Sequence, residues 1–195
     1  MQATPGAPLT SEAGSDGATH PRRTALFVVV AAVAWTADVV TKMLAVDLLA
    51  DRAPVDVVPG VLSLTLTRNP GAAFSIGTGL TVPLTLIACV VVVVVIRLAG
   101  RVRSTGWAWA LGLLLGGALG NLTDRILRAP GPFRGHVVDF LRLPNWPVFN
   151  LADSCIVAAA LLIALLSVRG IGLDGSRQPS GSAAAGPEPG RETGG

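Results

Sequence analysis

The sequence predicts a membrane protein of mainly α-helical class with four transmembrane helices. Hydrophobic residues make up 51% of its 195 residues and charged residues only 14%, with a mean hydropathy of +0.61. Soluble domains usually contain roughly 25% charged residues. The few charges are also absent from several long apolar stretches, each close to the ~20 residues that a helix needs to cross a bilayer.

The two ends of the chain differ from this apolar centre. Residues 1–23 and 170–195 are rich in Gly, Ala, Pro and polar residues and show no periodicity, which is typical of disordered segments. We therefore expect two disordered cytoplasmic tails. The remaining residues, 24–169, are expected to form one four-helix transmembrane domain.

The first predicted span runs from Thr24 to Val46, behind Arg22 and Arg23. The alternative is a cleaved signal peptide, since Ala32-Val33-Ala34 resembles a cleavage site. However, the apolar run continues past that site and three more apolar runs follow. A retained first helix is the better interpretation.

Two charged residues lie inside this first span. Asp38 and Lys42 are four residues apart, so they share one helix face and can form an ion pair. Charged groups inside a span usually face protein or water rather than lipid. We favour a structural pair that fixes helix packing over a catalytic role.

The connection from Asp47 to Gly79 is too polar to span a membrane. Residues 61–67 alternate apolar and polar side chains, as a strand on a surface does. Asn69-Pro70-Gly71 then predicts a turn. The small residues after it would let another backbone approach closely.

Three further spans follow. They are predicted at about Leu80–Ile96, Trp107–Asn121 and Val148–Val168. The third predicted span contains glycines that suit close helix contact. It ends in residues 121–125, beyond which Pro130 and Pro132 exclude continued helix.

The orientation follows from arginines next to the spans. With four spans, one side of the membrane receives Arg22, Arg23, Arg97, Arg101, Arg103 and Arg169. The opposite side receives Arg125, Arg128, Arg134 and Arg142, which weakens the rule. We give most weight to the first helix and to the short loop after the second, which places both termini in the cytoplasm. The stretch 136–153 then lies on the outer side.

Several kinds of function find no support in the sequence. With only two histidines there is no HExxH zinc motif, and phosphate-binding and dinucleotide-binding glycine motifs are missing. The net charge of +3 is too small to argue for nucleic acid. Cys89 and Cys155 lie in apolar runs without metal-ligand spacing, so we interpret them as small hydrophobic residues. We expect no metal and no cofactor.

Carboxylates remain as candidates for chemistry on the outer side. Asp124 stands beside Arg125 and four residues before Arg128, so a helix-end ion pair could explain it. Asp153 follows Asn150 by three, as in a helix capping box.

Asp139 is harder to explain structurally, because it lies in the apolar strand-like run VVDFL without an adjacent base. A lone carboxylate there is costly unless it is protonated or shares a proton. Two neighbouring carboxylates can share one proton, activate a water as general base and protonate a leaving amine. The residues alone leave both this aspartyl dyad and purely structural roles open.

The chain resembles the lipoprotein signal peptidases (signal peptidase II), a family of membrane aspartyl proteases. The resemblance is carried by five blocks in order, which are DVVTK at 38–42, RNPGAAFS at 68–75, GNLTDR at 120–125, VVDF at 137–140 and FNLAD at 149–153. They cover most of residues 24–168. Any one block is weakly specific, but five in this order on four spans are highly specific.

The resemblance implies a fold, an activity and a set of site residues. The fold has four transmembrane helices, a small extracytoplasmic β-sheet and a short covering helix, and the first connection could supply both extra elements. Asp139 and Asp153 match the catalytic dyad. The positions that match the substrate site are Asn69, Gly71, Asn121, Arg125 and Asn150. Asp38 and Lys42 match a structural pair, and Asp124 matches a supporting position that we expect to pair with Arg125.

The implied substrate is a prolipoprotein, cut just before its diacylglyceryl-modified cysteine at the outer face of the bacterial inner membrane. Membrane lipid is the other expected partner, and we expect a monomer. The segment between Asp139 and Asp153 departs from the family pattern, because it is short and carries Pro144 and Pro147. Two other functions remain as alternatives. A transport subunit would spread its acids through the membrane depth, and a lipid head-group transferase would need a nucleophile that is not evident.

Overall fold

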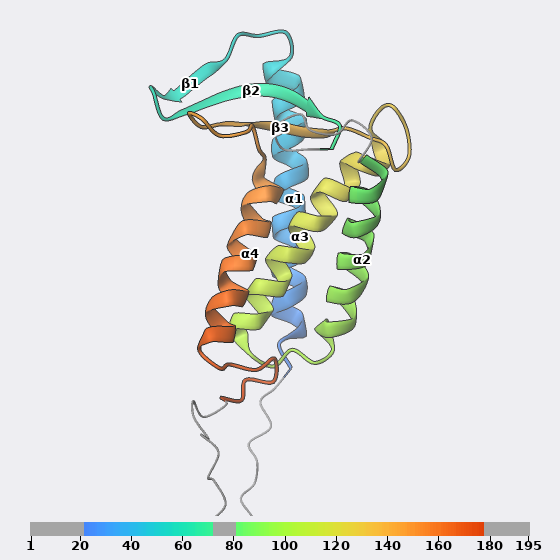
Figure 1. Cartoon of the computed structure of the whole chain (residues 1–195), viewed down its shortest axis with the longest axis vertical. Coiled ribbons are helices and arrows are strands. Elements are labelled where there is room, and N and C mark those ends of the chain that lie inside the picture. Colours follow the sequence, from blue (N-terminus) through green and yellow to red (C-terminus); the bar gives the residue numbers. More distant parts are fainter. Residues whose placement is uncertain (1–21, 72–80, 178–195) are drawn as a thin grey trace, which may run out of the picture.

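The structure, a computed structural model, describes residues 22–71 and 81–177. It contains, in chain order, α1 (Thr24–Leu49), β1 (Val55–Val58), β2 (Leu62–Asn69), α2 (Thr81–Ala99), α3 (Thr105–Leu127), β3 (Val137–Arg142) and α4 (Leu151–Val168). Figure 1 shows the four helices side by side, with the three strands crossing one end of the bundle. The mainly helical class and the small sheet are therefore confirmed.

Helix α3 stands between the other helices and packs against all three. Its glycines allow this close contact. A Cβ added at Gly116 would lie 2.6 Å from Ala34 Cβ on α1, and one added at Gly117 would lie 2.6 Å from Ala152 O on α4. The close helix contact that the glycines of this span predicted is therefore present.

Within the described ranges, three helices are long and apolar enough to cross a membrane, namely α1, α2 and α4. The third predicted span corresponds to α3, which does not meet this criterion. Its central place explains the difference, because a helix surrounded by protein need not be apolar on every face. It carries the buried charged residues Asp124 and Arg125 near its C-terminal end.

Several helix ends differ from the sequence prediction. Helix α1 continues past Val46 to Leu49, and α3 continues through residues 121–125 to Leu127. Helix α4 begins at Leu151 rather than at Val148, because Asn150 caps its N-terminus. Asp124 and Arg128 therefore lie at the C-terminal end of α3, and Asp153 lies in the first turn of α4.

The sheet has the order β1-β2-β3 with antiparallel neighbours. β2 corresponds to the strand predicted at 61–67, and β3 contains the strand-like run around Asp139. β1 was not predicted. The sheet attaches to the bundle where Val138 and Phe140 of β3 pack against Ala45 and Leu49 of α1.

The short covering helix expected from the family resemblance is not among the elements formed by residues 22–71 and 81–177. The described part of the first connection forms β1 and β2 instead. Residues 72–80, which include most of the block 68–75, lie outside the described structure.

The opposite end of the bundle is closed by backbone hydrogen bonds. Arg23 N donates to Val102 O at 3.0 Å, and Arg103 N donates to Leu173 O at 2.9 Å. After α4 the chain turns back over the loop between α2 and α3, and Leu173 packs against the hydrophobic core there. The described structure therefore extends to residue 177, beyond residue 169, where we expected the transmembrane domain to end.

Candidate active site

Asp139 is buried on one face of the sheet, on β3. Because side chains alternate along a strand, packing of Val138 and Phe140 against α1 turns Asp139 to the opposite face. Its side chain is only 2% exposed. Asn69 Nδ2 on β2 donates to Asp139 Oδ2 at 2.9 Å. The pair is diagonal across the strands, since Asn69 lies opposite Val137.

Asp153 lies in the first turn of α4, which begins beside this face of the sheet. Asp153 N donates to Asn150 Oδ1 at 2.9 Å, and Asn150 N donates back to Asp153 Oδ2 at 3.2 Å. The capping box predicted from the spacing of these residues is confirmed. It satisfies two backbone N–H groups at the helix start and fixes the Asp153 carboxylate there.

Asn150 also contacts Asp139, so it connects the two acids. Its Nδ2 donates to Asp139 Oδ1 at 2.6 Å, and its side chain is fully buried. The same side chain therefore caps the helix that carries Asp153 and holds the carboxylate on β3. The two acids are brought together although 14 positions separate their residue numbers.

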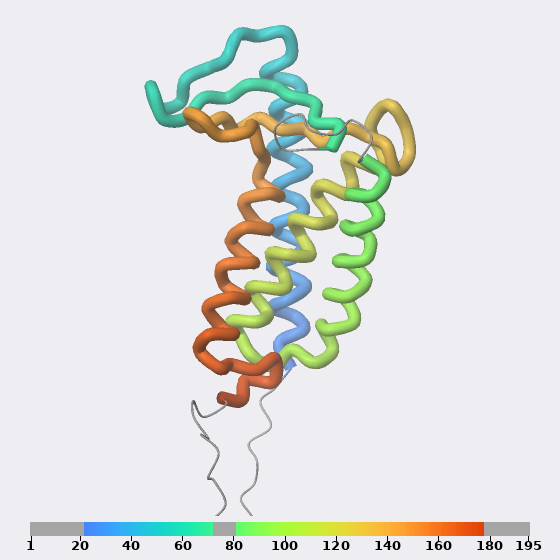
Figure 2. Tube along the Cα trace, in the orientation of Figure 1, coloured from blue at the N-terminus to red at the C-terminus, as the bar shows by residue number. Residues whose placement is uncertain are grey.

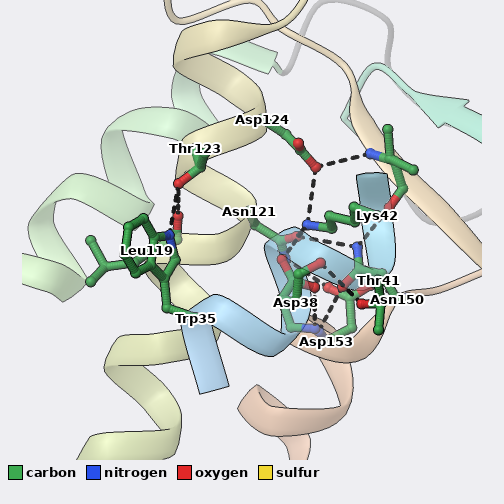
Figure 3. Close-up of polar contacts among 12 residues, drawn as sticks. Trp35, Asp38, Thr41, Lys42, Leu119, Asn121, Thr123, Asp124, Asn150 and Asp153 are labelled. Carbon is green, nitrogen blue, oxygen red and sulfur yellow. Dashed lines mark hydrogen bonds and ion pairs between the residues drawn. The ribbon is translucent and has the colours of Figure 1, made fainter. Parts of the chain in front are cut away.

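Asn121 on α3 joins this pair to a buried lysine. Its Nδ2 donates to Asp153 Oδ1 at 2.8 Å. Its Oδ1 accepts from Lys42 Nζ at 2.9 Å and from Asn150 Nδ2 at 3.2 Å. Figure 3 shows Asn121 between Lys42 and Asp153.

Three oxygen atoms, one of them Asn121 Oδ1, lie close to Lys42 Nζ. Besides Asn121 they are Asp38 Oδ2 at 2.8 Å and Asp124 Oδ2 at 3.0 Å. The Asp38 contact is an ion pair without hydrogen-bond alignment. Asp38 Oδ1 accepts from Ala152 N on α4 at 2.8 Å. The predicted Asp38–Lys42 pair is thus present, and it ties α1 to both α3 and α4.

Asp124 uses both carboxylate oxygens in the structure. Its Oδ2 accepts from Val138 N at 3.1 Å in addition to Lys42, and its Oδ1 pairs with Arg128 Nε one turn on. The ion pair with Arg128 was one structural alternative from the sequence and is confirmed. Asp124 and Arg125 form no direct hydrogen bond or ion pair in the described structure, although their charges interact at longer range. The reason is that adjacent residues on a helix point in different directions.

Arg125 is buried near the acids but is not hydrogen-bonded through all its donors. Its side chain is 9% exposed, and within the described residues Nη1 has no hydrogen-bond partner. The guanidinium lies within electrostatic range of Asp139, Asp124 and Asp153. An unpaired buried donor of this kind is costly unless something else accepts from it.

The Asn69-Pro70-Gly71 segment forms the predicted turn. Gly71 N donates to Asn69 Oδ1 at 2.9 Å, which is an Asx turn. Gly71 has a φ of 145°, and an added Cβ would lie 3.2 Å from the backbone of Thr81. The Thr81 hydroxyl donates to Pro70 O and closes the turn against α2. Glycine is needed here for both reasons.

Burial raises the pKa of the Asp139 carboxyl from its ordinary value of 3.8 to about 6. Hydrogen bonds from Asn69 and Asn150 oppose this by stabilising the charged form, whereas the charge of Asp153 acts in the same direction as burial. Asp139 is therefore suited to hold a proton at a pH where an exposed aspartate is ionised.

The structure brings the predicted site residues together from five elements, which are α1, β2, α3, β3 and α4. Two donors were missed, the backbone N–H groups of Val138 and Ala152, because a backbone donor has no residue type that marks it in a sequence. Within the described ranges no cluster of three or more His, Cys, Asp or Glu residues could hold a metal ion. The arrangement is one of two linked carboxyls surrounded by asparagine amides.

Comparison with known proteins identifies relatives of the chain. The family described as signal peptidase (SPase) II matches residues 30–169. A lipoprotein signal peptidase of Mycobacterium tuberculosis (strain ATCC 25618 / H37Rv) is 50% identical over 173 residues, which is 86% of each chain. One from Rhodococcus jostii (strain RHA1) is 52% identical over 160 residues, or 82% of this chain and 80% of that one.

A solved structure is also similar, that of a bacterial membrane enzyme determined by the in meso method at 2.3 Å resolution. It is 26% identical, has a TM-score of 0.69, and the match covers 77% of this chain and 92% of the other. The chain therefore shares its fold with a solved bacterial membrane enzyme.

Proposed function

The chain belongs to the signal peptidase II family, and on that premise we propose that it is an aspartic endopeptidase whose dyad is Asp139 and Asp153. It removes the signal peptide from a prolipoprotein by cutting just before the diacylglyceryl-modified cysteine. The observation that carries the proposal is that Asn150 contacts both acids, through Asp139 Oδ1 and through the capping box of Asp153. A structural explanation of each acid alone does not require this link.

The proposed reaction uses one proton shared by the two acids. Asp139, whose pKa burial raises to about 6, carries the proton, and Asp153 is ionised. Asp153 accepts a proton from the attacking water while Asp139 donates its proton to the carbonyl oxygen, which gives a neutral tetrahedral diol. As the C–N bond breaks, the nitrogen takes the proton held by Asp153 and the diol returns its proton to Asp139.

Neighbouring groups orient the acids and the substrate. Asp153 accepts hydrogen bonds from Asn121 Nδ2 and from Asn150 N, and these hold its carboxylate in place. The unpaired Nη1 of buried Arg125 is the group we assign to a carbonyl oxygen of the bound peptide. Asn69 and Gly71 shape the adjoining turn, and we assign them to the same substrate site.

The proposed topology has four spans, with α3 as the central one. The acids then lie at the outer end of the bundle, beside the sheet, and both termini are cytoplasmic. The substrate cysteine carries the lipid, so neither Cys89 nor Cys155 has a catalytic role.

The test measures cleavage of a diacylglyceryl-modified prolipoprotein by purified wild type, Asp139→Asn and Asp153→Asn. Each variant should lose at least about three orders of magnitude in rate, since members of a catalytic unit act together. Each should remain folded in the membrane. The unlipidated prolipoprotein should not be cut by wild type.

Two controls make the outcome specific. Asp56→Asn changes an exposed acid on β1 and should leave cleavage unchanged. Asp124→Asn should keep activity in proportion to the protein that remains folded, because Asp124 contacts structural groups. Cleavage at the wild-type rate by either dyad variant, or a folded but inactive Asp124→Asn, would overturn the assignment.

A further inference from the structure

The sheet attaches to the bundle at a particular membrane depth. The 26 residues of α1 rise about 39 Å at ~1.5 Å per residue, whereas the hydrocarbon core is ~30 Å thick. α1 is therefore longer than that core is thick. β3 packs against this end, at Ala45 and Leu49, while Leu44 and Leu48 on the same turns are more than half exposed. The sheet thus lies beside exposed apolar side chains at the C-terminal end of α1.

An apolar groove lies between α1 and the sheet. It has a volume of about 190 Å³, and its lining includes Leu44, Leu48, Leu64 and Phe140. The only hydroxyl in its wall, that of Thr41, contacts backbone carbonyls of its own helix at 2.8 and 3.0 Å. The groove offers water no free polar group. A hydrocarbon chain suits it better.

The turn between β3 and α4 presents an exposed tryptophan. Trp146 N donates to Leu143 O at 3.3 Å, and Asn145 has a φ of 56°. With Pro144 before Asn145, this is a type II turn. Leu141 and Phe149 exchange backbone hydrogen bonds at 2.8 and 2.9 Å and close the loop. Trp146 is nevertheless 64% exposed, so a rigid loop holds it outward.

The hairpin beside this turn is also apolar on its surface. Its exposed valines are Val55, Val57, Val58 and Val61. The hairpin and the turn share a cavity of about 270 Å³ that Arg142 also lines, so they are neighbours. Figure 2 shows both at the end of the sheet, projecting past the outer end of α4. We call this region, residues 55–61 and 142–146, the sheet end.

We propose that the sheet end is a membrane-anchoring surface that rests in the outer lipid–water interface, with a lipid acyl chain in the groove under the sheet. Tryptophan is enriched at that level of a bilayer, and the exposed Arg142 can meet lipid phosphates. An exposed apolar edge strand invites aggregation in water, but at the interface it contacts lipid. The anchor would hold β3, and Asp139 on it, at a fixed depth.

Fluorescence of Trp146 tests the proposal without reference to catalysis. Wild type and Trp146→Phe are placed in vesicles of phosphatidylethanolamine and phosphatidylglycerol, and the difference of their spectra isolates Trp146. We expect blue-shifted emission and at least a twofold quenching by lipids brominated near the glycerol end. Quenching by aqueous iodide without quenching by brominated lipid would overturn the proposal. So would quenching that arises only when a prolipoprotein peptide is added, because that identifies a peptide contact.

Spin labels give an independent measurement. In a variant without Cys89 and Cys155, nitroxides are attached at Val61→Cys, at Leu48→Cys in the groove, and at Arg52→Cys, an exposed position between α1 and β1. The first two labels should collide with oxygen at least twice as often, relative to a water-soluble nickel complex, as the label at residue 52. Equal ratios at all three sites contradict the proposal.

Discussion

Asn150 determines the geometry of the site at the scale of single residues. It donates to Asp139 on β3, and it caps α4, the helix whose first turn carries Asp153. Asn121 has a similar double role, since it donates to Asp153 and accepts from Lys42. Amides suit these positions because one side chain offers both a donor and an acceptor. Each acid is therefore oriented by a neighbour that is itself fixed.

Asp139→Asn should change how stability depends on pH. Burial raises the pKa of Asp139 from 3.8 to about 6, so the folded state holds its proton more tightly than the unfolded state. As pH rises from about 4 to 7, wild type should lose stability relative to the variant by an amount on the order of 3 kcal/mol. Below the unfolded pKa this difference disappears. Loss of an acceptor in the variant adds only a pH-independent offset.

Denaturation of both proteins in detergent at several pH values provides the measurement. Groups common to the two proteins cancel in the difference. A wild-type–variant difference that stays constant from pH 4 to 7 would show that Asp139 is not perturbed by burial.

The sequence predicted local relations between site residues and missed the distant ones. The Asp38–Lys42 pair and the Asn150–Asp153 capping box depend on spacings of four and three, which one helix turn fixes. That Lys42 also contacts Asn121 and Asp124 depends on how α1 packs against α3. No single-sequence spacing specifies such packing. The motif resemblance, rather than periodicity, grouped those residues.

At the scale of elements, helix α3 packs against its neighbours through glycine residues. Gly116 and Gly120 contact α1, where an added Cβ at Gly120 would lie 2.3 Å from Asp38 Oδ2. The glycine pattern predicted close packing but not the partner helix. β1 was missed because its residues VDVV are short and exposed on both faces, so they show no alternation of burial. The start of α4 moved to Leu151 because Asn150 caps that helix.

Gly116→Ala should destabilise the protein, although alanine favours a helix by ~1 kcal/mol over glycine. The new Cβ would lie 2.6 Å from Ala34 Cβ and 2.7 Å from the backbone oxygen of Ala31. Backbone cannot move aside as a long side chain can, so we expect a cost of about 1–3 kcal/mol. Thermal unfolding in detergent measures it.

Gly100→Ala is the matched control, because nothing lies within 4 Å of a Cβ added at Gly100. Its unfolding temperature should stay close to that of wild type. Equal behaviour of the two variants would mean that α1 and α3 are not closely packed at Gly116.

At the scale of the whole molecule, the structure clarifies the count of arginines on the outer side. Of the four that weakened the orientation, Arg128 is paired with Asp124 and Arg125 is buried beside the acids. Neither is a charge in a solvated loop, which is what the positive-inside rule counts. Arg52, Arg68, Arg134 and Arg142 remain exposed on the side of the bundle that carries the sheet. Six arginines lie next to the opposite helix ends, so cytoplasmic termini stay the prediction.

Reporter fusions test this orientation. A phosphatase that is active only outside the cytoplasm should be inactive when fused after residue 195, and active when fused after Pro144. A fluorescent protein that folds only in the cytoplasm should give the opposite pattern. The reverse result would place the site on the cytoplasmic face and remove the basis for acting on exported prolipoproteins.

The contacts around Lys42 have a consequence for the proton of the proposed dyad. Four carboxylates, those of Asp38, Asp124, Asp139 and Asp153, meet three cations, Lys42, Arg125 and Arg128. One added proton makes this cluster electrically neutral. Net charge is costly in a low-dielectric interior. The proton that the proposed reaction uses would therefore also serve as the counter-ion of this cluster.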